Sequence, residues 1–185
     1  MSEHLNINFR DLVETHKKRV FNTCISFVQN TEDAEDISQE VFIEVYRSLH
    51  HFKQQANVST WIYRIAVNKS LDFLRRKKSK KRFAFFSNLF HEETGEVLHE
   101  QADFEHPGIQ LENKENSKYL FKVIDTLPEN QKTAFILFTI EELSQKEIAE
   151  VMKISPKAAE SLIQRAKVGL RKKLEFFYGQ RRKLK

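Results

Sequence analysis

Residues 60–82 read TWIYRIAVNKSLDFLRRKKSKKR, a stretch that begins with aromatic and apolar side chains and ends with a basic cluster. Its apolar residues recur at steps of three and four positions, which is the spacing of one face of an α-helix. They are Trp61, Ile62, Ile65, Ala66, Leu71 and Leu74. No Gly or Pro interrupts the pattern. The stretch therefore predicts one long helix whose first part lies in a core.

The remaining arc of this helix is polar and becomes strongly basic, because seven of the eight residues from 75 to 82 are Lys or Arg. A row of such donors most often contacts phosphate groups. The same charge run is also compatible with a solvated helix end. The polar side chains on this arc are Arg64, Asn68, Lys69, Asp72, Arg75 and Arg76.

The composition indicates an all-α protein of one domain or two small ones. The chain has 185 residues, of which 40% are apolar and 31% charged, and only four Gly and three Pro interrupt it. Its apolar segments follow helical rather than alternating periods. No apolar run approaches the roughly 18 residues that cross a bilayer, and the first residues lack a signal-peptide pattern. We expect a cytoplasmic protein without membrane insertion.

A helix is predicted at 9–28, with Cys24 on its apolar face as a buried small side chain rather than a nucleophile. A second helix follows, with Thr31 as its expected N-cap and acids in its first turn. Its row Ile37, Val41, Val45 and Leu49 can pack inward. Another face carries Asp36, Gln39 and Glu40, a surface that can bind a basic partner or simply form an acidic helix start.

A short polar loop at 53–59 separates this helix from the basic one, for which Ser59 or Thr60 is the expected N-cap. The loop adjoins Trp61 and Tyr63, and loops beside aromatic rings are suited to hold an unstacked base. The same aromatic residues are equally explained as core.

Helical periodicity fades from 83 to 116, where acids accumulate, so this segment is predicted to join two domains. It contains Phe83, Phe85, Phe86 and Phe90, which either extend the first core or contact a partner, and we favour the first. Glu96 and His99 have the only metal-like spacing, and one such pair makes no metal site. We expect neither a metal nor a cofactor.

The second half carries clearer signals. Helices are predicted at 118–126 and 129–140. Ser144 and Glu147 form a capping box that starts a short helix, and Ser155 and Pro156 start another. Two helices across so short a turn predict a helix-turn-helix. On the second one, Ala159, Leu162, Ile163, Ala166 and Leu170 face inward. The outward set can reach bases and phosphates, although a structural hairpin remains an alternative. This set is Lys157, Glu160, Ser161, Gln164, Arg165 and Lys167.

Four segments in this order resemble a bacterial RNA polymerase sigma factor of the extracytoplasmic function (ECF) group of the sigma-70 family. They are DAEDISQEVFIEVYRSLHHF at 33–52, STWIYRIAVNKSLDFLRR at 59–76, IDTLPENQKTAFIL at 124–137, and LSQKEIAEVMKIS at 143–155 followed by SLIQRAKVGLRKKL at 161–174. The resemblance implies two helical domains, region 2 at 1–82 and a region 4 helix-turn-helix at 117–185, joined by an acidic linker at 83–116. It also implies binding to core polymerase, promoter-specific initiation, no catalysis and no small-molecule substrate.

The resemblance assigns roles to particular residues. It implies that Asp36, Gln39 and Glu40 contact the β′ clamp helices of the polymerase. It implies that the loop at 53–59 takes a flipped base of the −10 element, at a cost that stacking offsets. The implied −10 set is Lys53, Gln54, Gln55, Asn57, Ser59, Trp61, Tyr63, Arg64, Asn68, Lys69, Arg75 and Arg76.

Region 4 is expected to read the −35 element through the outward set on its second helix and to contact the β flap. The chain departs from the family here, because KAAESL at 157–162 stands where Gly-Thr-Val-Lys/Arg-Ser-Arg is common. Glu accepts from cytosine N4 whereas Arg prefers guanine. We therefore predict an unusual −35 element, read by Glu160, Ser161, Gln164 and Arg165.

Two other functions account for fewer of these features. A stand-alone helix-turn-helix repressor or activator needs neither the Asp36, Gln39, Glu40 face nor the 59–68 segment. A helical enzyme would need paired metal motifs, a nucleophile with its base or a phosphate loop, none of which the sequence shows. ECF factors are often held by an anti-sigma factor, which the sequence does not identify.

Overall fold

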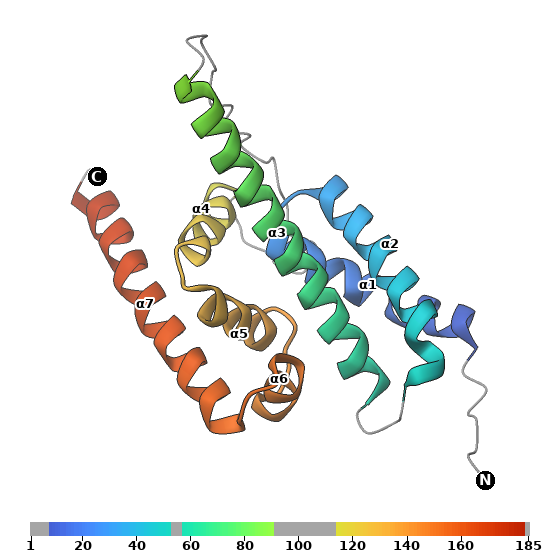
Figure 1. Ribbon diagram of the computed structural model, residues 1–185. Helices are drawn as coiled ribbons and strands as arrows, with labels where there is room; N and C mark the ends of the chain where they lie inside the picture. The colour runs from blue at the N-terminus through green and yellow to red at the C-terminus, as the bar shows by residue number, and fades with distance from the viewer. Residues whose placement is uncertain (1–7, 53–56, 91–113, 184–185) are drawn as a thin grey trace.

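The computed structural model describes residues 8–52, 57–90 and 114–183 (Figure 1). Over these ranges the chain forms seven α-helices and one short 3-10 helix, with no strand, which confirms the all-α prediction. Lys53, Gln54 and Gln55 of the predicted −10 loop, and Glu96 and His99, lie outside the described residues. None of the helices described is long and apolar enough to cross a membrane.

The N-terminal half, residues 8–90, consists of α1 (Phe9–Val28), α2 (Thr31–Ser48), η1 (Leu49–His51) and α3 (Val58–Phe90). The three α-helices contact one another around a shared apolar core. Cys24 is fully buried there, and burial raises the pKa of its thiol to about 11, so the thiol stays protonated at neutral pH. Fully or almost fully buried core residues here are Val20, Cys24, Phe27, Ile37, Val41, Val45, Ile62 and Ala66.

Asparagine residues provide the helix starts that the sequence had assigned to Thr and Ser. Asn30, not Thr31, is the N-cap of α2, because its side-chain oxygen accepts from the Asp33 amide at 2.8 Å. Asn57 accepts from the Ser59 amide at 2.9 Å, and α3 begins at Val58, before the predicted caps. Asn is as good an N-cap as Ser. Residue preference alone therefore does not distinguish the Asn at each helix start from the Thr or Ser that follows it.

Helix α3 is also longer than predicted, since it continues to Phe90 instead of ending near 82. The side chains of Phe83, Phe85, Phe86 and Phe90 lie outside the described part of the structure. The basic cluster therefore lies in the middle of a helix of 33 residues rather than at its end.

The C-terminal half, residues 114–183, consists of α4 (Lys114–Asp125), α5 (Glu129–Thr139), α6 (Gln145–Met152) and α7 (Pro156–Lys183). The predicted capping box is confirmed, because Ser144 and Glu147 each accept a hydrogen bond from the other's backbone amide. Ser155 Oγ accepts from the Ala158 amide at 3.2 Å and starts α7 as predicted. The turn between α6 and α7 contains Lys153 in the left-handed region, with φ 55°.

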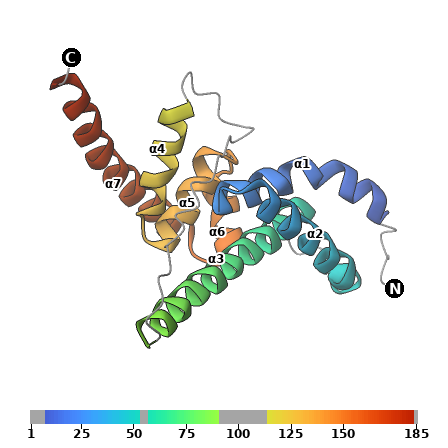
Figure 2. The same cartoon turned by 90° about the horizontal axis from the view of Figure 1, so that it is seen from above.

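The two halves pack directly against each other, an arrangement that the sequence did not predict. Helix α6 contacts α3, and α5 contacts α1. Figures 1 and 2 show the C-terminal half lying along one side of α3, with α2 on the other side. Residues far apart in the sequence therefore share a buried boundary, and several predicted functional residues lie at it.

Candidate functional sites

The predicted acidic face of α2 is exposed. Asp36, Gln39 and Glu40 all point to solvent, while the opposite row of Ile37, Val41 and Val45 is at most 2% exposed. This division follows from the helical period, because positions three and four apart share a face. The structure thus brings the three predicted polymerase-binding residues together on one surface.

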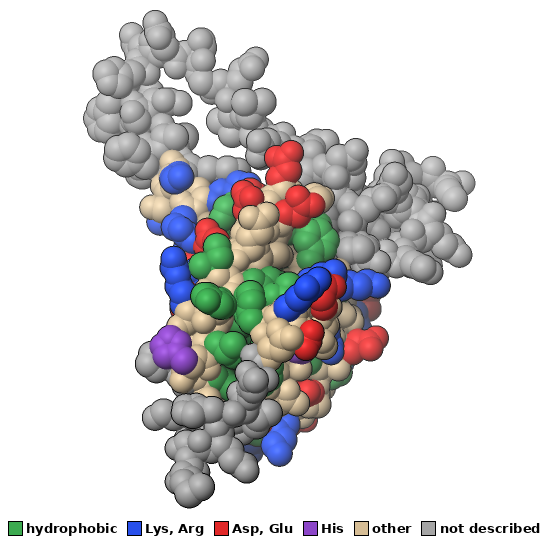
Figure 3. Space-filling model, turned by 90° about the vertical axis from the view of Figure 1, so that its right-hand side faces the viewer, with side chains coloured by type: hydrophobic (Ala, Val, Ile, Leu, Met, Phe, Trp, Pro, Cys, Tyr) green, Lys and Arg blue, Asp and Glu red, His purple; other side chains and the backbone are tan. Residues whose placement is uncertain are grey.

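Two large apolar side chains continue the exposed surface of α2 toward its C-terminus. Ile43 is 50% exposed and Tyr46 is 65% exposed. The Phe9 ring packs edge-on against Tyr46 with centroids 5.0 Å apart. In Figure 3, which shows the side of the molecule on which α2 lies, hydrophobic side chains gather in the middle, and acidic ones lie above them and to their right.

The acidic face of α2 also adjoins the predicted DNA-contacting surface of α3. Lys69 Nζ lies 3.5 Å from a carboxylate oxygen of Glu40 and 3.9 Å from one of Glu44. These pairs are partly exposed, so they contribute little stability. Lys69 can therefore exchange these carboxylates for a phosphate at small cost.

The predicted −10 residues at the start of α3 fall into two groups. Asn57 is exposed and Ser59 half-buried, whereas Trp61 is 9% and Tyr63 only 4% exposed. The Trp61 ring packs on Phe52 with centroids 4.8 Å apart. In this arrangement the two aromatic residues serve as core, the alternative that the sequence left open.

Tyr63 lies at the boundary between the halves. The Arg19 guanidinium is 5.1 Å from the centre of its ring, and the His16 ring meets it edge-on at 6.5 Å. Burial raises the pKa of the Tyr63 phenol, which keeps it protonated. A base cannot stack on this ring while it is buried in this way.

The basic part of α3 is exposed but partly occupied by acids. Asn68, Arg75 and Arg76 are exposed, and Arg64 and Lys69 are half-buried. Arg75 donates to both carboxylate oxygens of Glu129 on α5, at 2.5 and 3.3 Å, and to Asp72 at 3.0 Å. The second half of the chain thus supplies a carboxylate where the sequence predicted a DNA phosphate.

Helix α7 divides as the sequence predicted, with one difference. Ala159, Ile163 and Ala166 are at most 1% exposed and Leu170 is 4% exposed, but Leu162 is only half-buried. Of the outward set, Ser161 is half-buried and the others are exposed: Lys157, Glu160, Gln164, Arg165 and Lys167. Lys167 Nζ lies 4.3 Å from the centre of the Phe138 ring. The exposed row can face a major groove.

Sequence reasoning missed three charged residues at the boundary between the halves: Arg19, Lys132 and Glu141. Lys132 is 8% exposed and Glu141 is 6% exposed. No local pattern indicates a buried Lys or Glu, because each is buried by residues more than 100 positions away in the sequence. Among the described residues, no group of three or more His, Cys, Asp or Glu could hold a metal ion.

Known families match both halves of the chain. Sigma-70 region 2 matches residues 12–80, and Sigma-70, region 4, matches residues 117–170. The ECF RNA polymerase sigma factor SigW of Bacillus subtilis is 33% identical over 90% of this chain and 88% of its own. The ECF RNA polymerase sigma-E factor of Escherichia coli K12 is 31% identical over 90% of this chain and 86% of its own.

Two solved structures share the fold over most of the chain. The sigma factor RpoE, in complex with the anti-sigma factor NepR from Bartonella quintana, aligns with a TM-score of 0.64 and 18% identity. It covers 90% of this chain and 96% of its own. CnrH, in complex with the cytosolic domain of CnrY, aligns with a TM-score of 0.63 and 21% identity, over 90% of this chain and 87% of its own.

Proposed function

The chain belongs to the ECF group of sigma-70 family sigma factors, and from this membership we propose how its residues divide the work of promoter recognition. A sigma factor binds core RNA polymerase and directs it to promoters. We propose the working units predicted from the sequence: 1–82 for core binding and the −10 element, 117–185 for the −35 element, and 83–116 as the connection. The family matches at 12–80 and 117–170 lie inside these bounds and support them.

The acidic face of α2 is the proposed contact with the β′ clamp helices. The observation that carries this assignment is the joint exposure of Asp36, Gln39 and Glu40 on one helix face. Carboxylates placed in this way complement a basic partner and set the orientation of docking. A stand-alone repressor or activator is not favoured, because it has no use for this face.

The exposed polar residues of α3 are the proposed −10 contacts. Asn68 is exposed and lies beside the half-buried Arg64 and Lys69 on the polar arc of α3, which supports base contact by the amide and phosphate contact by the cations. Lys53, Gln54, Gln55, Asn57 and Ser59 form the proposed site for a flipped base. Trp61, Tyr63, Arg75 and Arg76 complete the proposed set.

The outward set on α7 is the proposed −35 reader, with the β flap as the partner of the same half. Glu160, Gln164 and Arg165 are exposed near the N-terminal end of α7, the part of a recognition helix that enters the major groove. Lys157 and Lys167 are the phosphate contacts, and Ser161 is at the edge of the row.

In this proposal the protein catalyses no reaction itself and needs no cofactor or small-molecule substrate. It acts in the cytoplasm, where the polymerase works. An anti-sigma protein is a further partner that this function allows, as for the Bartonella quintana protein in its solved complex.

The test is the affinity for sigma-free bacterial core polymerase. Asp36→Ala combined with Glu40→Ala should raise the dissociation constant about tenfold or more, a loss of at least ~1.4 kcal/mol. Glu14→Ala is the matched control, because Glu14 is an exposed acid of α1 whose ion pair is with its neighbour Lys17 on the same helix. Equal affinities for the double variant and the control would refute the assignment of this face.

A further inference from the structure

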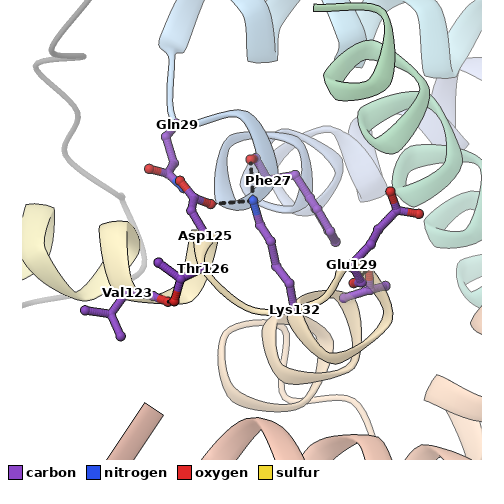
Figure 4. Close-up of polar contacts among 8 residues, drawn as sticks. Phe27, Gln29, Val123, Asp125, Thr126, Glu129 and Lys132 are labelled. Carbon is purple, nitrogen blue, oxygen red and sulfur yellow. Dashed lines mark hydrogen bonds and ion pairs between the residues drawn. The ribbon is translucent and has the colours of Figure 1, made fainter. Parts of the chain in front are cut away.

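A buried lysine joins the two halves at the end of α1. Lys132 Nζ on α5 donates to Asp125 Oδ1 at 2.5 Å and to the backbone carbonyl of Phe27 at 3.3 Å (Figure 4). Gln29 Nε2 donates to both carboxylate oxygens of Asp125 at 2.9 Å. The carbonyls at a helix C-terminus carry negative partial charge, so a cation is favoured there. The C-terminal half thus supplies a cation to the end of a helix in the N-terminal half.

A second polar contact joins the halves in the turn after α5. Arg19 Nη2 donates to the backbone carbonyl of Glu141 at 2.9 Å, and Thr23 hydrogen-bonds the Glu141 carboxyl. The other carboxyl oxygen, Oε1, is buried without a hydrogen-bond partner in the described structure. An unsatisfied buried oxygen is costly when it is charged and much less so when the carboxyl is protonated. We call these two groups, centred on Lys132 and Glu141, the closing contacts.

The packed arrangement engages residues that the proposed function needs. Tyr63 is buried against Arg19 and His16 of its own half, near the charges of Glu141 and Glu147 from the other half. Arg75 is held by Glu129 of the other half. Both belong to the proposed −10 surface. In this form the Tyr63 ring of that surface is buried and the Arg75 guanidinium is already paired with Glu129.

The packed arrangement is also too compact for both promoter elements. Elements centred near −10 and −35 lie about 25 base pairs apart, roughly 85 Å of B-form DNA. Helix α6 contacts both α3 and α7, so these two DNA-facing helices are separated by about one helix diameter, ~10–12 Å. The halves must separate before both elements are bound. The 23 residues between Phe90 and Lys114 span at most ~80 Å when extended. The 33 residues of α3 add a helix length of ~50 Å, so the chain is long enough for this separation.

We propose that the packed arrangement is a resting form of this sigma factor, held by the closing contacts, and that loss of a proton from Glu141 favours its opening. The proposal rests on the proposed function only for the role of Tyr63 and Arg75 in contacting the −10 element. The existence of a packed and an open form, and their response to pH, do not depend on the proposed function.

The direction of the pH response follows from the surroundings of Glu141. Burial raises the pKa of its carboxyl to about 7, against an ordinary value of 4.5 in the open form. The packed form therefore binds the proton more tightly and is favoured at low pH. The extra stability that this proton gives the packed form is lost as the pH rises from 4.5 through 7. The ratio of packed to open molecules should therefore fall about tenfold between pH 6 and 8.

Other titratable groups surround Glu141 and are part of the response. Arg19 and Cys24 from α1 and Tyr63 from α3 interact with Glu141 directly. His16 from α1 and Glu147 from α6 act on the same group through Arg19 and Tyr63. Burial, with the nearby Arg19, lowers the pKa of His16, so His16 opposes Glu141 by favouring the open form below about pH 6.5. Only a comparison with Glu141→Gln isolates the carboxyl.

The experiment measures the distance between the halves in the full chain, free of polymerase and DNA. Fluorophores are attached to Glu35→Cys on α2 and Lys172→Cys on α7, both exposed, in a Cys24→Ala background. Energy transfer between the labels is followed from pH 5.5 to 8.5. The same series is recorded with Lys132→Met, which removes one closing contact and brings the two forms nearer to equal population.

The ratio of open to packed molecules should rise about tenfold from pH 6 to 8 with Glu141 and stay nearly constant with Glu141→Gln. Glu142→Gln is the matched control, because Glu142 is the exposed neighbour and should leave the response unchanged. An unchanged distance in every variant, or equal responses of Glu141→Gln and Glu142→Gln, would overturn the proposal. Normal polymerase binding by the same proteins would then show that the proposed function survives.

Discussion

At the scale of single residues, Glu160 distinguishes this recognition helix from the common family pattern. The sequence predicted its outward position, and the structure leaves it exposed on α7 beside Gln164. A carboxylate accepts hydrogen bonds and donates none, so it pairs with the cytosine amino group and not with the acceptors of guanine. The base read at one position of the −35 element therefore depends on this side chain.

Glu160→Arg should exchange the preferred base at one −35 position from cytosine to guanine. A bidentate contact contributes about 1–3 kcal/mol of discrimination, or roughly 5- to 150-fold. The measurement is transcription from a promoter library randomised at −35, with purified polymerase. Lys157→Ala is the comparison, since loss of a phosphate contact should weaken all sequences alike. A uniform change for Glu160→Arg would contradict the assignment.

The role of a residue could be predicted where it is set by the residue's own helix. It could not be predicted where it is set by contacts with the other half of the chain. Ser155 and the Ser144, Glu147 capping box followed from local rules and are confirmed. Lys132 and Glu141 did not, because their burial arises from contacts with α1. Tyr63 was given two roles from the sequence, and the structure shows the buried one.

At the scale of elements, the helices were predicted well and their starts less well. The apolar rows of α1, α2 and α7 follow the helical period, so their inward faces could be read directly. The cap of α2 was assigned to Thr31 because Thr precedes the acidic turn, yet Asn30 also fits there and forms the hydrogen bond. Hydrophobic periodicity identifies the buried face of a helix, but it does not identify the residue at which the helix begins.

The N-cap of α2 gives a direct stability prediction. Asn30→Ala should lower the free energy of unfolding by about 1 kcal/mol, because the Asp33 amide loses its acceptor. Thr31→Ala should change it by much less, since Thr31 is exposed within the first turn. Urea unfolding followed by circular dichroism measures both. A larger loss for Thr31→Ala would restore the sequence-based cap.

At the scale of the whole molecule, the helices of each half were predicted but the packing of the two halves was not. The sequence patterns of α1–α3 and of α4–α7 each describe a self-contained set of helices. The boundary between them is built from single polar residues and from the covered side of α3, which have no period to detect. Arg75 with Glu129 is one ionic contact of this boundary, and it joins the basic part of α3 to α5.

The most direct test of the central claim is run-off transcription with sigma-free bacterial core polymerase on a pool of genomic DNA fragments. Addition of this protein should produce discrete start sites that share a −10 and a −35 element, and Asp36→Ala with Glu40→Ala should abolish most of the product. The start sites would at once reveal the bases that α3 and α7 read. No initiation above core polymerase alone, with the folded protein bound to DNA but not to polymerase, would contradict the account.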